Sequence, residues 1–241
     1  MTPLLLSATA FEQERVAAGL DQPLRQSVAG RQWTRGVLGG RTVQVVETGL
    51  GAVNTAHALT RSLQMELPPW VLQFGVGGAY ENAGLGLGDL AVATTESFGD
   101  LGVVTPAGWR SAEEIGIPVA EAGGESRYNE YPLDAALGRA AATALEERME
   151  APVALGPFVT VQACSGTAAL GRERAARAPG ALCESMEGAA AAQLCWIYGV
   201  PLVEVRAISN RVEDRDTSAW DLPLAGRRAQ EAARILVEAL P

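Results

Sequence analysis

The residues best suited to chemistry lie near the carboxyl end of the chain, in the segments Ser185–Gly188 and Arg206–Arg211. An alanine-rich helical stretch and a short apolar strand separate the two segments, which puts Glu187 at a helix start and Asn210 just past a strand. In open α/β sheets, ligands bind outside the carboxyl ends of the strands. A carboxylate and a side-chain amide at that edge suit a ligand with hydroxyls on one side and a polar heterocycle on the other. A purine nucleoside fits that description.

Two further charged residues, Glu12 and Arg206, occupy positions that suit either a catalytic or a structural role. Glu12 follows the first apolar strand, where it would either activate a water, worth ~10²–10⁴ in rate, or sit solvated in the first turn of a helix. Arg206 lies in an apolar strand and is predicted to face inward, which requires a partner. The position of Glu12 alone supports the catalytic and the structural interpretation equally.

Several motifs resemble the nucleoside phosphorylase/nucleosidase superfamily, and within it the nucleosidases that use water. Any one of them is weak, but together they follow the family's order at compatible spacing and cover most of the chain. They are Leu4–Thr9 with Glu12, the glycine turn Thr48–Asn54, the central glycine loop Gln73–Ala79 with the strand Leu87–Val92, the loop Cys164–Thr167, and the pair Met186–Glu187 and Arg206–Asn210.

The resemblance implies a role for each matching residue. Glu12 would activate the attacking water, and Arg206 would contact Glu12 and that water. Glu187 would bind the sugar hydroxyls and Met186 would pack on the apolar sugar face, although in isolation they would be interpreted as a helix-terminal acid and a core methionine. The other expected substrate contacts are Gly75, Val76 and Gly77 of the central loop, Ser165 beside the base, Ser209, which would orient Asn210, and Arg211.

Two departures point to a subgroup of the family. Nucleosidases that act on methylthioadenosine and adenosylhomocysteine carry an aspartate where this chain has Asn210, and an aromatic residue where it has Ala169. The pattern most resembles the futalosine hydrolases of the alternative menaquinone pathway. That resemblance implies release of hypoxanthine from futalosine, leaving dehypoxanthine futalosine.

The chemistry of an asparagine agrees with a 6-oxopurine. Hypoxanthine presents an oxygen at position 6, which an ionised aspartate would repel. The amide of Asn210 can donate to that oxygen while its carbonyl accepts from a protonated N7. We therefore expect Asn210 to recognise the base and stabilise the leaving group without donating a proton. An asparagine that only caps a turn is the alternative.

The sequence also bears on other activities. Phosphorolysis is disfavoured because Leu72-Gln73-Phe74 carries no cation before the glycine loop and Glu12 would repel phosphate. The nearer alternatives are a methylthioadenosine/adenosylhomocysteine or aminodeoxyfutalosine nucleosidase, and a non-catalytic nucleoside-binding protein on the same fold. Arg211 and Arg215 would suit the benzoate of futalosine, but a mixed-charge loop is more often solvated surface.

Composition limits the class of protein. The chain has 241 residues, 48% of them hydrophobic, and a net charge of −9, so one domain over residues 1–241 is expected and neither nucleic acid nor an anionic membrane is an expected partner. The three cysteines lack metal-type spacing and fit a reducing cytoplasm. We expect no metal or other cofactor, a small purine nucleoside as the ligand, and a homo-oligomer.

Apolar and polar stretches alternate as strands and helices along the chain. This alternation predicts a three-layer α/β fold, a mixed and largely parallel central sheet flanked by helices, as in nucleoside phosphorylases. Helices are expected from Glu12 and over 52–65, 133–148, 186–198 and 222–240, and strands at the N-terminus and over 42–47, 70–74, 89–94, 153–162 and 200–208. The Gly- and Pro-rich stretch 97–132 is expected to be a loop, either a lid, a subunit contact or a surface excursion.

Three other motifs do not complete a known site. The glycines of 49–51 and 75–78 do not complete a dinucleotide fingerprint, because Asn54 and Tyr80 replace the third glycine. His57 is the only histidine and lies in a helical pattern, which excludes a site with several imidazoles. Ser165 lacks the Gly-x-Ser-x-Gly elbow of a hydrolase triad.

Overall fold

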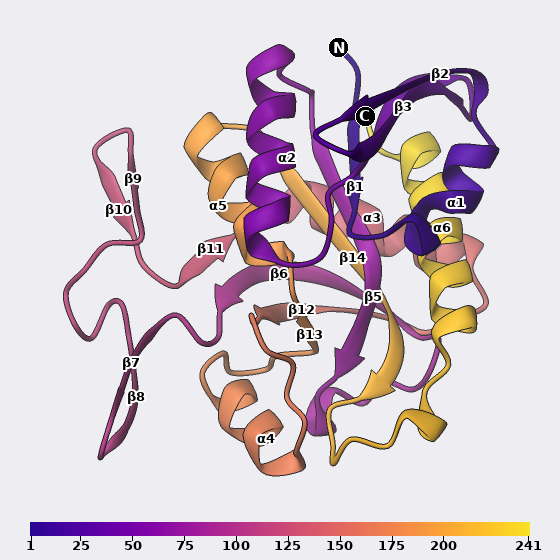
Figure 1. Ribbon diagram of the computed structural model, residues 1–241. Helices are drawn as coiled ribbons and strands as arrows, with labels where there is room; N and C mark the ends of the chain where they lie inside the picture. Colours follow the sequence, from indigo (N-terminus) through magenta and orange to yellow (C-terminus); the bar gives the residue numbers. More distant parts are fainter.

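The computed structural model describes residues 1–241, and one sheet of ten strands forms its centre (Figure 1). In chain order these strands are β1 (Leu4–Ser7), β2 (Asp21–Val28), β3 (Arg31–Leu38), β4 (Arg41–Glu47), β5 (Val71–Ala79), β6 (Leu90–Phe98), β11 (Glu130–Pro132), β12 (Val153–Thr160), β13 (Cys183–Ser185) and β14 (Leu202–Arg211). Nine of them follow the order β11-β6-β12-β13-β5-β1-β4-β3-β2, and β14 pairs with both β5 and β6.

The double pairing of β14 closes part of the sheet on itself. β14 runs parallel to β5 and antiparallel to β6, while β12 and β13 connect β6 back to β5. On the other side of β5, β1 pairs parallel with both β5 and β4. The carboxyl ends of β1, β5 and β14 therefore meet at one edge, where the predicted site residues follow or end the strands.

The fold has six α-helices, and five of them cover the sheet in two groups. The six are α1 (Ala10–Ala18), α2 (Ala52–Met65), α3 (Ala135–Arg148), α4 (Ala168–Ala176), α5 (Gly188–Tyr198) and α6 (Leu222–Ala239). Helices α1, α3 and α6 pack into one apolar core, and α2 and α5 pack into a second core on the other side of the sheet (Figure 1). The predicted three-layer, mixed α/β fold is confirmed. None of the helices combines the length and apolar character needed to cross a bilayer.

The C-terminal helix–strand pair shows how the sequence sets the site. The alanines of α5 are buried, and Gly199 ends the helix in the left-handed conformation with φ 65°, which glycine adopts without steric cost. β14 is buried over eight consecutive residues, as expected for a strand covered on both faces. It continues to Arg211 with an irregularity between Ile208 and Asn210. Asn210 thus lies within the strand, and the prediction that it follows the strand is wrong.

Most of the predicted elements are present, but a hairpin of β2 and β3 was missed. The residues of β2 are almost all exposed, so the strand has no apolar alternation by which to recognise it. Its turn uses Ala29 and Gly30, both at positive φ, and lacks the Asn-Gly or Asp-Gly pair that signals such turns.

The stretch 97–132 is more ordered than the predicted loop. It contains the two small hairpins β7 (Gly102–Thr105) with β8 (Gly108–Ser111) and β9 (Ala120–Ala122) with β10 (Glu125–Arg127). Figure 1 shows both hairpins projecting from the body of the molecule. Their strands are three or four residues long and mostly exposed, so they carry little periodic signal.

Candidate active site

A cavity of about 430 Å³ opens at the edge where β1, β5 and β14 end. Its volume lies within the ~300–1,000 Å³ of small-molecule sites. Ten of the predicted residues line it: Glu12, Val76, Gly77, Ser165, Met186, Glu187, Arg206, Ser209, Asn210 and Arg211. Gly75 does not line the cavity. Its lack of a side chain leaves space for Glu12 and Arg206. A side chain there would overlap Oε1 of Glu12 and lie 3.0 Å from Nη1 of Arg206.

Glu12 is buried and held at both carboxylate oxygens. It is the third residue of α1, where Oε2 accepts from the backbone N–H of Thr9 at 3.0 Å and from its hydroxyl at 2.9 Å. Oε1 accepts from the N–H of Val76 at 2.9 Å. The same residue therefore caps its helix and faces the cavity, so the structural and functional interpretations of Glu12 coexist.

The environment makes Glu12 a stronger base than a solvated glutamate. Burial raises the pKa of Glu12 above its usual range, and the positive charge of Arg206 opposes that rise. The hydrogen bonds from Val76 and Thr9 also favour the ionised form. A carboxylate with a raised pKa that remains hydrogen-bonded is suited to accept a proton from water.

Arg206 lines the cavity and pairs with two carboxylates. Its Nε–H donates to Oε1 of Glu204 at 2.8 Å, and Nη1 donates to Oε2 of Glu187 and to the carbonyl of Val76, both at 3.2 Å. The structure gives Arg206 no hydrogen bond to Glu12, which acts on it through its charge alone. The expected direct contact with Glu12 is therefore wrong.

Glu204 was missed by the sequence analysis although a signal was present. It stands two residues before Arg206 in a strand, and residues two apart in a strand face the same side. It is fully buried within an apolar run. A buried glutamate and a buried arginine at this spacing predict an ion pair.

Glu187 lies at the N-cap of α5, beside the cavity. Its Oε1 accepts from the N–H of Gly51 at 2.9 Å, and its Oε2 accepts from Arg206. Each carboxylate oxygen has further lone pairs, so Glu187 can still accept hydrogen bonds from hydroxyls of a ligand. Gly51 has φ 86° at the N-cap of α2, a conformation that favours glycine.

Asn210 lines the same cavity as Glu12. Oδ1 of Asn210 accepts from the hydroxyl of Ser209 at 2.8 Å, and Nδ2 donates to the carbonyl of Arg211 at 3.0 Å. One N–H of the amide and one lone pair of its oxygen remain free. The side chain can therefore present one donor and one acceptor, side by side, to a ligand.

Another carboxylate, that of Glu184, orders the loop that contains Ser165. Glu184 accepts from the N–H of Ser165 at 2.7 Å and from its hydroxyl at 2.5 Å. The hydroxyl of Tyr80 donates to Glu184 at 3.2 Å, and Arg174 donates to the Ser165 oxygen at 3.0 Å. Glu184 lines the cavity and was missed, although a glutamate in the apolar run before Ser185 indicates a buried, paired charge.

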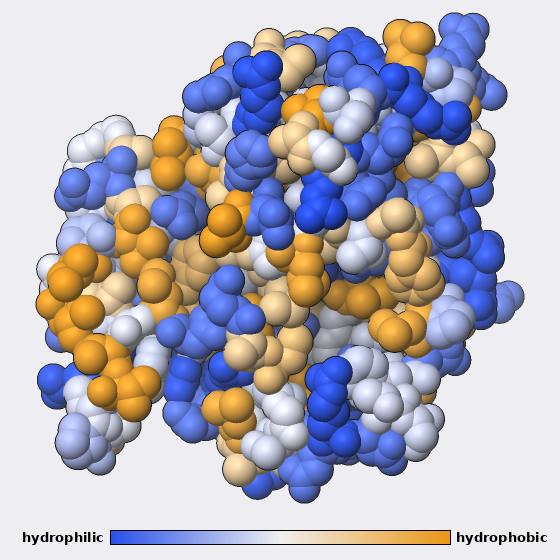
Figure 2. All heavy atoms as spheres, in the orientation of Figure 1, coloured by the Kyte–Doolittle hydropathy of each residue, from blue (hydrophilic) through white to orange (hydrophobic).

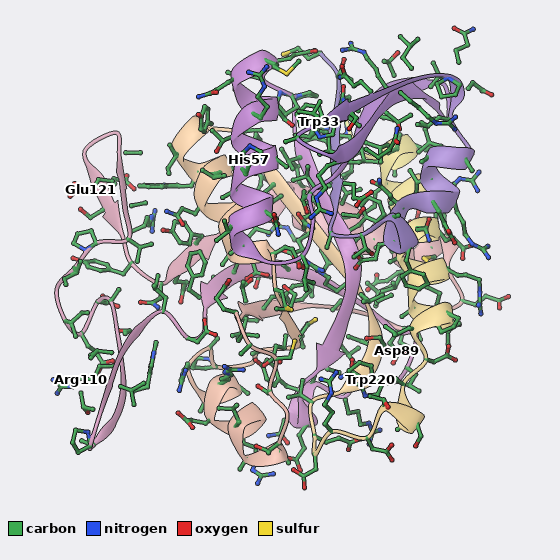
Figure 3. The ribbon with its side chains drawn as sticks, viewed as in Figure 1. Trp33, His57, Asp89, Arg110, Glu121 and Trp220 are labelled. Carbon is green, nitrogen blue, oxygen red and sulfur yellow. The ribbon has the colours of Figure 1, made fainter.

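The cavity mouth is aromatic and charged. Arg215, over the ring of Trp220 at 4.7 Å, lines it together with the exposed Arg211. The only histidine, His57, is exposed on α2 and does not line the cavity; Figure 3 shows it far from Trp220.

A model of the phosphorylase superfamily matches residues 4–240. The chain belongs to this superfamily. Among its relatives, the futalosine hydrolase of Acidothermus cellulolyticus is 32% identical over 95% of this chain and 87% of that protein. The 5'-methylthioadenosine/S-adenosylhomocysteine nucleosidase of Lysinibacillus sphaericus is 27% identical over 94% of each.

Solved structures of the superfamily share the fold. The methylthioadenosine/adenosylhomocysteine nucleosidase from Neisseria meningitidis, in complex with methylthio-immucillin-A, superposes with a TM-score of 0.85 at 22% identity and covers 99% of each chain. Like these relatives, the present protein is an enzyme that hydrolyses N-glycosidic bonds.

The contacts of Glu12 predict a pH dependence. If ionised Glu12 accepts the proton of water, kcat/KM falls as pH drops through its pKa, which burial raises above 4.5. Thr9→Val removes a hydroxyl that stabilises the ionised form, so the acidic limb should move to higher pH. Thr9→Ser keeps the hydroxyl and is the matched control. If Thr9→Val and Thr9→Ser gave the same profile of kcat/KM against pH, the assignment of Glu12 as the base would be contradicted.

Proposed function

We propose that this enzyme hydrolyses futalosine, releasing hypoxanthine and dehypoxanthine futalosine in the alternative menaquinone pathway. The observation that carries the proposal is Asn210, which lines the same cavity as Glu12 and keeps one amide N–H and one oxygen lone pair without a protein partner. Those two groups complement O6 and a protonated N7 of hypoxanthine. The 32% identity to a futalosine hydrolase across nearly the whole chain supports the same substrate.

In this proposal, Glu12 takes the proton of the attacking water. The water oxygen bonds to the anomeric carbon as the bond to N9 breaks, and the bonding electrons leave with the purine. The purine takes its N7 proton from solvent, and Asn210 stabilises the protonated base. Glu187, held by Arg206 and Gly51, accepts hydrogen bonds from the sugar hydroxyls. Met186 packs on the apolar face of the ring.

The rest of the substrate would extend through the mouth of the cavity. We propose that Arg211 binds the benzoate there, because it is exposed and lines the mouth. Asp214 and Asp216 line the same rim and would repel an anion placed beside them. The stacking of Arg215 on Trp220 keeps a second cation at the rim.

We also propose that the chain is one domain and acts as a homo-oligomer. Apolar residues on the projecting stretch are exposed, including Val104 at 81% and Ile117 at 61%. Figure 2 shows apolar side chains gathered over this part of the molecule. Clusters of exposed apolar residues commonly mark protein contacts, and light scattering of the purified protein measures the assembly.

A second candidate is methylthioadenosine/adenosylhomocysteine hydrolysis. It is supported by the Lysinibacillus relative and the Neisseria structure, because each matches nearly the whole of this chain. A chromatographic assay of purified enzyme with futalosine, aminodeoxyfutalosine and methylthioadenosine separates the two. Hypoxanthine release from futalosine at the highest kcat/KM is expected. A higher kcat/KM with either adenine nucleoside would overturn the futalosine proposal.

Glu12→Gln tests the base directly. The amide keeps the size of the side chain but cannot accept a proton from water, so we expect turnover to fall by at least the ~10² typical of a general base. The affinity for the substrate should stay within a few fold of wild type. Stopped assays for the released base and calorimetry with intact substrate measure the two quantities. Retained turnover would remove Glu12 from the mechanism.

Asn210→Asp tests base recognition. A carboxylate faces O6 with a repulsive lone pair, so hydrolysis of the oxopurine should fall by roughly 10²-fold or more. Residual activity should shift towards adenine nucleosides. Asn210→Ser, which removes the amide without adding charge, separates loss of contacts from repulsion. An unchanged substrate profile in the Asp variant would count against the assignment.

A further inference from the structure

Two fully buried glutamates lie behind the candidate site and have no part in the proposed reaction. Glu96 comes from β6 and Glu204 from the neighbouring β14. Both approach the first residue of α5, because a side chain at Gly188 would overlap Oε1 of Glu96 and Oε2 of Glu204. The two oxygens are therefore brought to the same point, and only glycine leaves room for them.

The remaining oxygens of the pair are already satisfied. Oε2 of Glu96 accepts from the hydroxyl of Thr160 at 2.7 Å, and Oε1 of Glu204 accepts from Nε of Arg206 at 2.8 Å. The two oxygens that meet at Gly188 are those without any other hydrogen-bond donor. Two ionised carboxylates cannot share a buried site without strong repulsion. One proton between them satisfies both oxygens and removes the repulsion.

We propose that Glu96 and Glu204 share one proton and act as a positioning pair that fixes the guanidinium of Arg206 against Glu187. Glu96 is the protonated member and donates to Glu204, which stays ionised beside Arg206. Glu96 then touches no substrate and acts only through Glu204 and Arg206. The inference rests on the proposed site, where Glu187 binds the sugar.

The electrostatic environment agrees with this division of roles. Burial, followed by the charge of Glu204, raises the pKa of Glu96 well above its usual range. Burial also raises the pKa of Glu204, but the adjacent Arg206 opposes that rise. The proton therefore belongs to Glu96, the carboxyl that has no hydrogen bond from a cation.

The hydrogen bonds form a circuit that starts and ends at α5. The N–H of Ala189, in the first turn of that helix, donates to the Thr160 hydroxyl at 2.8 Å. From Thr160 the chain continues through Glu96, the shared proton, Glu204 and Arg206 to Glu187, the N-cap of the same helix. Fixing Arg206 at its Nε edge leaves Nη1 directed at Glu187. The pair thereby sets the position of the carboxylate proposed to bind the sugar.

Other ionisable groups near the pair could affect its pH response. They are Cys183 of β13, with a pKa raised by burial, Tyr131 of β11, which pairs in register with Glu96, and Arg206 and Glu187. Glu12 of α1 acts on Arg206 through its charge. Burial raises the pKa of Tyr131 to about 12. The cysteine and tyrosine therefore stay neutral where the pair titrates.

Three substitutions test the pair with the purine nucleoside that the wild-type enzyme hydrolyses fastest. Glu96→Gln keeps an N–H donor to Glu204, so kcat should stay within about threefold of wild type. Glu96→Leu removes the donor, and Glu204→Gln removes the charge beside Arg206. Each of these should lower kcat at least tenfold with KM changed less than threefold. Glu146→Gln, on the exposed side of α3, is the control.

Stability against pH gives a readout that does not depend on the substrate. A carboxyl with a raised pKa contributes its full stability below the unfolded value near 4.5 and loses it as pH rises towards the folded value. Glu96→Gln cannot lose that proton, so its Tm should rise relative to wild type between pH 5 and 8. Glu146→Gln should show no such trend.

Two results would contradict the shared proton. A Glu96→Gln variant as inactive as Glu96→Leu would show that an ionised Glu96 is needed and would overturn the shared proton. A Tm difference between Glu96→Gln and wild type that stays constant from pH 5 to 8 would overturn it equally. The Tm series decides even if Glu96→Leu does not fold or if futalosine is not the substrate.

Discussion

The arginine at position 206 is the constraint around which the other site groups are arranged. Its guanidinium is 1% exposed and lies between Glu204 and Glu187 at 2.8 and 3.2 Å. A buried charge is strongly destabilising unless it is paired and hydrogen-bonded. The carboxylates that pair with it therefore cannot move independently, and the positions of Glu187 and of the backbone at Val76 follow from it. The same backbone segment donates to Glu12, which couples the proposed base to the proposed sugar ligand.

Close approach of chain segments makes this arrangement possible. Gly75 leaves space for Glu12 and Arg206, and Gly188 leaves space for the pair formed by Glu96 and Glu204. Both glycines stand where a buried carboxylate passes against the backbone. Low-dielectric surroundings strengthen each of these contacts. The site is therefore held rigid by polar groups that would be costly to leave unpaired.

Much of this could be predicted from the sequence. The helix Ala52–Met65 was predicted with its observed bounds, and α6 to within one residue, because their apolar faces repeat clearly. Most of the site residues carried motif signals, and they line one cavity. What could not be predicted depends on tertiary contacts. The exposed β2 has no apolar period, the ring closed by β14 requires pairing with two distant strands, and the partners of Arg206 depend on which buried carboxylate reaches it.

The most direct test of the central claim is Arg206→Lys, measured as kcat/KM with the preferred nucleoside and alongside Tm. Lysine keeps the positive charge but cannot donate from one planar group to Glu204, Glu187 and the Val76 carbonyl together. We expect kcat/KM to fall by roughly 10²-fold or more, as for the loss of an oriented charged contact in a catalytic site, with the fold retained. A folded Lys variant with kcat/KM within threefold of wild type would show that charge alone suffices and would contradict the account.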